Sequence, residues 1–346
     1  MRRTACKRLA PALFSAAGGG ALALLAASVF AAPEGPAASP SDRNGPGATT
    51  LACSTLGGEA PQTPVGWLTE SLKASHCYRF QARAVAIDAL NVRTLALSHR
   101  IQDGVRQQVI QHLDGPSVNV ERHARAGLWG WPSAQPGQSE SAAPMPRRWA
   151  EHVASVYDIA LARDERVAGR EAVRLTFTPQ SGNRYRHQWW LDQQTGLLLK
   201  HVLRDDSDVI LETFQITRLQ TPTRYARDVS VTPPEQKAGP NWQVGWLPGG
   251  MVEQPNTLRN ARANRTSRLY SDGLATVSVF VESPAAATLA TGVHRLGASA
   301  IAVERHAGDH PWQVIAIGEV PPELLGRIAR SVTRSDAPSP DAAGNP

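Results

Sequence analysis

HQWWLDQQTGLLLKHVLRDDSDVILETFQI, residues 187–216, is the stretch that decides the fold. Apolar and polar residues alternate along it, as side chains alternate between the two faces of a β-strand, and two short polar segments interrupt the pattern. The stretch therefore predicts three antiparallel strands joined by two turns. A half-exposed meander has one apolar face, but this one carries apolar residues on both. Something must cover each side.

The alternation assigns the side chains of the second strand to two faces, with Leu197, Leu199 and Leu203 on one and Leu198 and Val202 on the other. In the first strand, the adjacent Trp189 and Trp190 must point to opposite sides. One indole is expected in the core. The second suits a ligand or partner site, and packing beneath a helix is an equal alternative.

Further strand patterns occupy residues 78–128 and 170–219, and Asp-Gly pairs at 103–104 and 114–115 favour tight hairpin turns. Helical spacing of apolar residues predicts a short helix from Val65 and a second helix over 147–161. The polar stretch 129–146 is expected to be a loop. The fold class expected for the chain is therefore α+β and rich in β-strands.

The first 32 residues have the features of a secretory signal peptide. Four basic residues precede an apolar run that ends at Phe30, and Ala31 and Ala32 fit a cleavage site. An uncleaved membrane anchor is the alternative, although glycines 18–20 weaken a spanning helix. We expect an exported protein.

Removing the signal peptide changes the charge balance. The whole chain has 36 basic and 30 acidic residues, and all four charged residues of the signal peptide are basic. The mature chain is thus close to neutral, which does not support a general nucleic-acid binder.

Two cysteines remain after export, Cys53 and Cys77. An even number of cysteines in an oxidising compartment allows a disulfide, which would tie the N-terminal segment to the first domain. The alternative is two unpaired thiols.

Composition divides the mature chain into two domains. We expect a disordered linker at 33–62, a first domain at 63–219, a Pro-rich linker at 220–241, a smaller α+β domain at 242–334 and a disordered tail at 335–346. In the smaller domain, 274–282 predicts a strand, 298–320 a hairpin and 321–332 a closing helix.

Common catalytic and metal-binding motifs do not occur. We find no H-E-x-x-H, C-x-x-C, G-x-S-x-G or P-loop pattern. His306 and His310 are four residues apart, but a turn is expected between them. Asp205, Asp206 and Asp208 fit a polar hairpin tip better than a calcium site, because aspartates bond the local backbone in turns. We therefore expect no enzyme activity, no metal and no cofactor.

Arginines recur on two predicted strands of the first domain. Arg79, Arg83 and Arg93 lie on or near an early strand, and Arg184 and Arg186 lie on a later one. Guanidinium groups bind phosphate and carboxylate well, so these residues could bind anionic lipid head groups or an acidic peptide. A solvated outer face is the plainer alternative.

Five segments, in order along the chain, resemble the RseB/MucB family of periplasmic sigma-E regulators. They are HRIQDGVRQQVIQHLDGPSVNVER (99–122), WWLDQQTGLLLKHVLRDDSDVILETFQI (189–216), WLPGGM (246–251), RLYSDGLATVSVFVE (268–282) and AIGEVPPELLGRIARSV (316–332). The stretch around 129–146 and the two cysteines are not part of the resemblance.

The resemblance implies a first domain similar to the lipoprotein carriers LolA and LolB, a half-open antiparallel β-barrel around helices with an apolar cavity. It also implies a non-catalytic periplasmic regulator that binds the periplasmic part of a single-span anti-sigma factor, of the RseA or MucA type. Binding would shield that partner from site-1 protease, and lipopolysaccharide or another acyl-chain ligand would release it. A homodimer or higher oligomer is possible.

Two groups of residues carry these expected interactions. The lipid-binding residues expected in the first domain are Leu95, Leu97, Val109, Trp189, Leu197 and Leu199. The contacts expected with the anti-sigma factor are Trp246, Leu247, Arg259, Arg262, Arg265, Arg268, Tyr270, Ser271 and Asp272. The Asp-Gly pair at 272–273 has a structural alternative, since such pairs are common in turns that enter a strand.

Two other functions remain as alternatives. A lipid or lipoprotein carrier of the LolA type would not need the second domain, and deletion of 242–346 would leave it active. An exported hydrolase would turn over an ester or peptide substrate and lose that activity on replacement of a single Ser or His.

Overall fold

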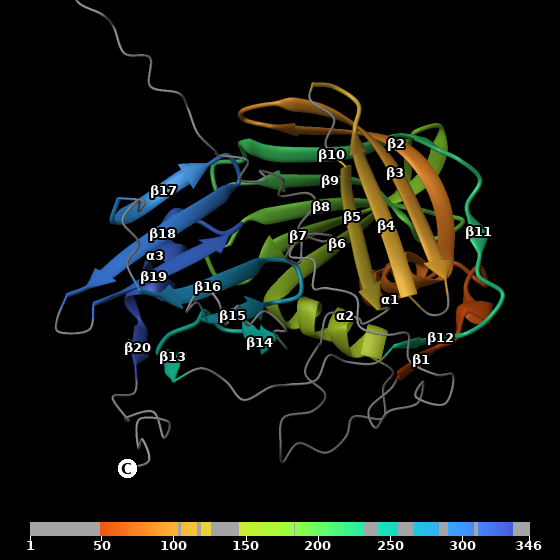
Figure 1. The fold of residues 1–346 in the computed structure, drawn as a ribbon. Helices are drawn as coiled ribbons and strands as arrows, with labels where there is room; N and C mark the ends of the chain where they lie inside the picture. Colours follow the sequence, from red (N-terminus) through yellow and green to blue (C-terminus); the bar gives the residue numbers. More distant parts are fainter. Residues whose placement is uncertain are drawn as a thin grey trace, which may run out of the picture.

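The computed structural model describes residues 49–102, 105–115, 119–125, 145–182, 184–231, 241–254, 266–283, 290–307 and 311–334 (Figure 1). The predicted signal peptide, most of the 129–146 loop and the C-terminal tail lie outside these residues. Within the described ranges, no helix is both long enough and apolar enough to cross a membrane.

One antiparallel sheet forms most of the first domain. Its strands follow the order β5-β4-β3-β2-β10-β9-β8-β7-β6, and the two-residue strand β11 adds to β2. The strands are β2 (Tyr78–Asp88), β3 (Val92–Gln102), β4 (Val105–His112), β5 (Asn119–Arg125), β6 (Tyr157–Val167), β7 (Arg170–Pro179), β8 (Arg186–Asp192), β9 (Leu198–Arg204), β10 (Ile210–Leu219) and β11 (Thr223–Arg224). The β-rich α+β class predicted from the sequence is confirmed.

The three strands predicted from the opening stretch are β8, β9 and β10. The turn between β8 and β9 contains Gly196 with a φ of +73°, a conformation that glycine adopts without strain. In the turn between β9 and β10, the Asp205 carboxylate accepts hydrogen bonds from the backbone N–H groups of Ser207 and Val209. The acidic tip is therefore a turn that its own side chain stabilises.

Helices α1 (Pro64–Cys77) and α2 (Met145–Val156) lie against one side of the curved sheet, which we call the inner face (Figure 1). The Thr63 hydroxyl accepts a hydrogen bond from Gly66 N–H and so caps α1. Trp67 and Leu68 from α1 and Trp149 from α2 join Trp189 in one buried cluster. The two helices therefore cover the inner apolar face of strands β8, β9 and β10.

The second helix ends earlier than predicted. Residues 157–161 continue as strand β6, because Tyr157, Ile159 and Leu161 alternate and pair with β7. Helical spacing and strand alternation overlap in this short apolar run, and pairing with β7 decides between them.

A β-bulge changes the predicted faces of β9. Trp190 pairs with Lys200, but the next pair is Leu191 with Leu198, so one extra residue of β9 lies between them. Leu198 therefore packs against the helix-side cluster beside Leu197, although alternation placed the two on opposite sides. Leu199, expected beside Leu197, belongs to a different cluster.

The opposite side, which we call the outer face, carries Trp190. Lys200 Nζ lies 4.6 Å from the centre of its ring and the Arg174 guanidinium 5.9 Å away, on the two neighbouring strands. These contacts fit cation–π interactions, and the aliphatic stems shield the indole. Trp190 is nonetheless buried, and it shares an apolar cluster with Val167, Ala172 and Val202.

The second domain packs one helix on a six-stranded sheet. The sheet order is β14-β15-β16-β19-β18-β17, and a separate pair joins β13 to β20. The elements are β13 (Trp242–Val244), β14 (Val252–Gln254), β15 (Thr266–Ser271), β16 (Thr276–Glu282), β17 (Gly292–Leu296), β18 (Ser299–His306), β19 (Trp312–Gly318), α3 (Pro322–Arg330) and β20 (Val332–Arg334). Leu325 and Ile328 of α3 share one buried cluster with Val277, Val279 and small residues of the sheet.

Ordered structure begins before residue 63. Strand β1 (Thr49–Leu51) pairs with β12 (Val229–Val231), so parts of both expected linkers form a two-stranded sheet. Leu51 and Val229 are buried in the helix-side core, which explains why these short segments are ordered despite their polar composition.

Cys53 and Cys77 form a disulfide across 24 residues of sequence, and both are buried. Cys53 lies in a 3₁₀ turn (Cys53–Thr55), and Cys77 is the last residue of α1. The bond joins the N-terminal segment to the junction of α1 and β2.

We predict that replacing both cysteines, C53A/C77A, lowers the free energy of unfolding by about 3 kcal/mol, because a loop of this length loses its closure in the unfolded chain. Denaturant unfolding of the variant and of the oxidised parent measures the difference. Equal midpoints for the two proteins would show that the bond contributes nothing to stability.

Candidate functional site: the joint between the domains

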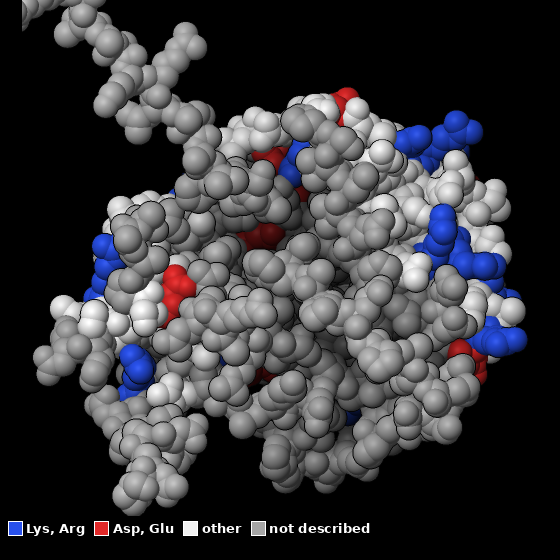
Figure 2. All heavy atoms as spheres, in the orientation of Figure 1, with Lys and Arg blue, Asp and Glu red and all other residues white. Residues whose placement is uncertain are grey.

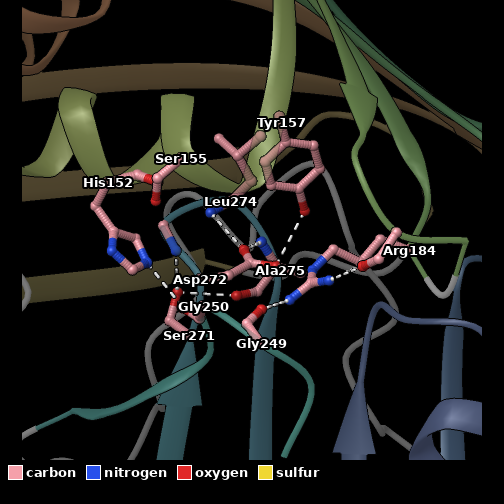
Figure 3. Close-up of polar contacts among 12 residues, drawn as sticks. His152, Ser155, Tyr157, Arg184, Gly249, Gly250, Ser271, Asp272, Leu274 and Ala275 are labelled. Carbon is pink, nitrogen blue, oxygen red and sulfur yellow. Dashed lines mark hydrogen bonds and ion pairs between the residues drawn. The ribbon is translucent and has the colours of Figure 1, made fainter.

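The fold brings helix α2, the start of β6 and the turn between β7 and β8 against two turns of the second domain (Figure 3). One turn joins β15 to β16 and contains Asp272, and the other contains Gly249 and Gly250 before β14. We call this contact the joint. Both turns come from segments on which the family resemblance was based, WLPGGM and RLYSDG.

A buried ion pair lies at the centre of the joint. Arg184 Nε donates to Asp272 Oδ2 at 2.7 Å, and the exposed fractions of the two side chains are 1% and 0%. Arg184 also donates to the Ser181 hydroxyl at 2.9 Å and to the Gly249 carbonyl. Such a pair stabilises only where its other polar atoms are also satisfied, and here they are.

The second oxygen of Asp272 organises its own turn. Oδ1 accepts hydrogen bonds from Leu274 N–H at 3.0 Å and Ala275 N–H at 2.8 Å. The Ser271 hydroxyl donates to the Ala275 carbonyl and accepts from Gly273 N–H. Oδ1 of Asp272 therefore stabilises the turn, and Oδ2 binds Arg184 of the first domain.

Tyr157 completes the cluster from the start of β6. Its hydroxyl donates to Asp272 Oδ2 at 3.1 Å, so this oxygen accepts from both Tyr157 and Arg184. Burial, and secondly the Asp272 charge, raise the pKa of Tyr157 well above its ordinary value. The phenol therefore stays protonated and remains a donor.

One face of α2 contacts two glycines of the second domain. A Cβ at Gly250 would lie 2.3 Å from a methyl of Val156, and a Cβ at Gly273 would lie 2.6 Å from a methyl of Val153. Both glycines also have positive φ. No other residue would fit either position without a shift of the helix.

Two side chains of the same helix donate to the two turns. Trp149 Nε1 donates to the Gly273 carbonyl at 3.2 Å, and His152 Nε2 donates to the Gly250 carbonyl at 2.7 Å. Burial lowers the pKa of His152, and the Gly250 bond partly opposes this. Leu274 enters the core of the first domain beside them.

A second contact between the domains lies at the ends of β8, β9 and β10. Ala298, in the turn between β17 and β18, packs with Tyr185, Leu203 and Leu211. The second domain thus contacts the first at α2 and at these strand ends.

Two carboxyl groups, one from each domain, interact electrostatically near this second contact. Glu319 is half-buried as a residue, yet burial of its carboxyl group raises its pKa well above 4.5, and the Glu212 charge raises it further. Glu212, on β10, is itself buried. A proton on Glu319 relieves the repulsion between two carboxylates on opposite domains.

The joint has the features of a structural contact between domains and not those of a catalytic site. It consists of a satisfied ion pair, turn hydrogen bonds and close helix–glycine contacts, with no free nucleophile beside a base. Over the described residues, no three His, Cys, Asp or Glu side chains come together as metal ligands would.

The expected lipid-binding residues fall into two buried clusters, apart from Val109. Leu95, Leu97 and Leu199 share a buried cluster, whereas Trp189 and Leu197 belong to the helix-side core. Val109 faces the opposite side of the sheet from Leu97, because Leu97 pairs with Ile110 and Val109 pairs with Ser98. Ile110, and not Val109, therefore lies on the same face of the sheet as Leu97.

The expected anti-sigma contacts also divide. Arg259, Arg262 and Arg265 lie outside the described residues. Arg268 donates to both oxygens of Glu253 and to the Trp242 carbonyl, so its charge is used within the domain.

Of the remaining expected contacts, Tyr270 and Asp272 are buried, and Asp272 forms the joint. The structural alternative for the Asp-Gly turn is therefore the one that the contacts favour. Trp246 and Leu247 are partly exposed, and the Arg327 guanidinium lies 3.6 Å from the centre of the Trp246 ring.

Tyr157 and His152 were not among the expected site residues. Arg184 was considered for an external anion, but it lies in the turn before β8 and pairs with Asp272 of the second domain. The sequence held two signals for the joint: the apolar spacing of α2, and a Gly-Gly and an Asp-Gly pair at turns of the second domain. Neither signal indicates which residues of the other domain would contact these segments.

We predict that D272N lowers the free energy of unfolding by about 3–5 kcal/mol, because the new amide would point a donor at two existing donors and leave Arg184 without its counter-ion. Denaturant unfolding, followed separately by tryptophan fluorescence and circular dichroism, measures the loss. The apolar double variant R184M/D272L should recover part of it. A single variant as stable as the parent would contradict the role of the pair.

We predict that E319Q is stabilised relative to the parent as pH rises. A carboxyl whose folded pKa is raised holds its proton longer when folded, so the parent's stability falls as pH rises from about 4.5 toward that raised pKa. The gap should grow by up to about 1.4 kcal/mol per pH unit.

Unfolding of parent and E319Q between pH 5 and 8 measures the gap, with E323Q, at an exposed glutamate, as control. His187, whose pKa burial lowers to about 3, affects both proteins alike. A gap that does not change with pH would refute the assignment.

Comparison with known proteins gives the chain a family. Residues 63–236 match the MucB/RseB N-terminal domain and residues 236–333 the MucB/RseB C-terminal domain. The sigma factor AlgU regulatory protein MucB of Pseudomonas aeruginosa is 29% identical over 297 residues, which are 77% of this chain and 89% of that protein. The sigma-E factor regulatory protein RseB of Haemophilus influenzae is 28% identical over 263 residues, 70% and 82% of the two chains.

Solved structures agree. The Pseudomonas aeruginosa MucA/MucB complex matches at a TM-score of 0.59 with 28% identity, over 79% of this chain and 99% of the matched one. A structure of MucB alone matches at 0.55 with 27% identity, over 79% and 98%. With both domain models matched in order across 63–333, the chain belongs to the MucB/RseB family.

Proposed function

We propose that this chain is a periplasmic negative regulator of the sigma-E envelope stress response. It binds the periplasmic part of a single-span anti-sigma factor, of the RseA or MucA type, and shields it from site-1 proteolysis. The observation that carries the proposal is the presence of both family domains in order, in a chain similar to a MucB solved in complex with MucA. No catalytic step is part of this function.

The first domain acts as a half-open β-barrel in this proposal. Its nine-strand path runs from β5 to β6 and bends around two helices (Figure 1). Among the described residues, β5 and β6 do not pair with each other, which leaves the sheet open along that edge. An open edge gives an acyl chain a route to the inner face.

The lipid site then lies on the inner face of β2, β3 and β9. Leu95, Leu97 and Leu199 belong to one apolar cluster there, together with Phe214 and Ile216. These side chains are packed, so an acyl chain must displace some of them or part the sheet from its cover. Release of the partner by lipid would follow from that displacement.

Helix α2 gives the two domains a shared element. It covers the inner face through Trp149 and Val153 and contacts Gly273 of the second domain with the same residues. A ligand that moves α2 therefore alters the joint. Two ligands that favour different domain arrangements are coupled reciprocally, and a coupling of about 1–3 kcal/mol changes affinity by roughly 5–150-fold.

The anti-sigma segment is proposed to bind the second domain near Trp246 and Leu247. Both lie at the edge of that domain's core and are partly exposed. Arg259, Arg262 and Arg265 would add charge for an acidic partner segment. Oligomerisation remains a prediction.

We predict that purified residues 33–346 capture the periplasmic segment of the cognate anti-sigma factor, and that lipopolysaccharide lowers the capture. D272N should weaken capture at least about tenfold, because the joint fixes the arrangement that the partner recognises. A pull-down with quantified bound fraction measures both effects.

The matched control is D192N, which breaks another Asp–Arg pair, the buried Asp192 with the partly exposed Arg170, away from the joint. Equal losses in the two variants would indicate general destabilisation. No capture with or without lipopolysaccharide would count against the regulator, and lipid transfer by residues 33–241 alone would favour the carrier.

A further inference from the structure

Two histidines lie side by side in the core of the first domain. His187 of β8 and His201 of β9 are 4% and 3% exposed, and their rings stack with centres 5.4 Å apart. His187 Nδ1 and His201 Nε2 share a hydrogen bond of 3.1 Å. The other two ring nitrogens are buried and bond no described residue. One shared bond leaves a donor on one neutral ring and an acceptor on the other, so the pair is incompletely satisfied.

Apolar side chains surround the pair. Its cross-strand neighbours are Phe177, Trp189, Leu203 and Phe214. Trp189 lies edge-on to His201, and Trp149 of α2 stacks on Trp189. A neutral imidazole is tolerated in such surroundings, whereas a charged one would lose its hydration without replacement.

The titratable groups around the pair do not compensate a positive charge on it. Those described on the neighbouring elements are Tyr157 of β6, Glu212 of β10, His152 of α2, and Arg184 and Asp272 of the joint. Arg147 and Glu151 of α2 pair with each other in solvent. Basic side chains lie at the surface, and Figure 2 shows the largest visible group along the margin where Figure 1 places β11. Burial lowers the pKa of His187 to about 3, and burial and the His187 charge lower the pKa of His201 well below 6.5.

The pair adjoins both contacts between the domains. The ring of His187 lies edge-on to Tyr157, with centres 6.0 Å apart, and the Tyr157 hydroxyl donates to Asp272 in the joint (Figure 3). Leu203, opposite His187, packs with Ala298 at the second contact. A separation of β8 and β9 from these neighbours would therefore loosen both contacts together.

We propose that His187 and His201 form an acid-sensitive switch that opens the first domain locally and loosens its contacts with the second. In the closed state both rings stay neutral, because a cation there has neither water nor a counter-ion. When β8 and β9 separate from their cover, water reaches the rings, and each binds a proton below its ordinary pKa of 6.5. The closed state binds fewer protons than the open state, so opening becomes more favourable as pH falls from 6.5 toward about 3.

Acid then weakens the grip on the anti-sigma segment, because the joint fixes the arrangement that the partner recognises. This release step rests on the regulatory function proposed above. The opening itself is a property of the chain alone and is measured without a partner.

The test is amide hydrogen exchange of residues 33–346 at pH 7.5 and 5.5, corrected for the intrinsic exchange rate at each pH, where closing is faster than exchange. Peptides that span β8 and β9 report the opening. H187N/H201Q places amide groups where the two ring nitrogens share their bond, and these amides do not titrate. We expect the protection of these peptides to fall about 100-fold more in the parent, because each exposed histidine contributes about tenfold between these pH values. Equal falls in the two proteins would overturn the switch.

Two comparisons keep the result specific. The matched control, H112Q/H294Q, removes two partly exposed histidines and should respond to pH like the parent. Peptides of β16, in the core of the second domain, should keep their protection in the parent. An equal fall in β16 would show that protons bind only on global unfolding and would contradict a local switch. If the double variant does not fold, H187N and H201Q are measured singly, and each should remove about tenfold of the pH effect.

Capture of the anti-sigma segment at the same two pH values tests the release step. The captured fraction should fall at least about threefold further in the parent than in H187N/H201Q, because only the parent gains protons on opening. Equal losses in the two proteins would refute release through this pair. Absence of capture at pH 7.5 would overturn the regulatory function alone, since the exchange measurement needs no partner.

Discussion

The arrangement of the two domains depends on one buried ion pair, Arg184 with Asp272. Taking two charges out of water costs several kcal/mol, and the attraction between them compensates only if every remaining donor and acceptor is satisfied. Tyr157, the turn amides, Ser181 and the Gly249 carbonyl meet that condition together. These groups come from both domains, so no part of the network can move alone.

The pair also explains the surrounding sequence. Because Asp272 is held by the other domain, the turns that flank it approach α2 closely, and Gly250 and Gly273 are required where a methyl group would meet Val156 or Val153. The same helix covers the inner face of the first sheet through Trp149. One short helix therefore forms part of the first core and part of the joint, which makes it the physical route by which a change in one domain reaches the other.

Sequence reasoning succeeded where the signal is local. Alternation located β8, β9 and β10, and helical spacing located both inner helices. It failed where the pairing between strands determines which face a residue occupies. An extra residue in β9 places Leu198 on the helix side. The register of β3 and β4 places Ile110, and not Val109, opposite Leu97. Arg184 and Asp272 are 88 positions apart, and no local pattern connects them. An arginine just before a strand and an Asp-Gly turn each have an ordinary explanation, and only the folded structure shows that they form a pair.

The bulge in β10 sets the chemistry of the two faces of β2. In a regular ladder Arg218 would enter the apolar inner face opposite Ala82, at the cost of burying a charge, and Leu219 would point to solvent. The extra residue exchanges them: Leu219 pairs with Ala82 and packs against the core, and Arg218 joins Arg83 outside. Apolar burial alone accounts for the position of Leu219. It does not account for a second arginine beside the first, since a neutral residue at 218 would satisfy the same packing without repulsion.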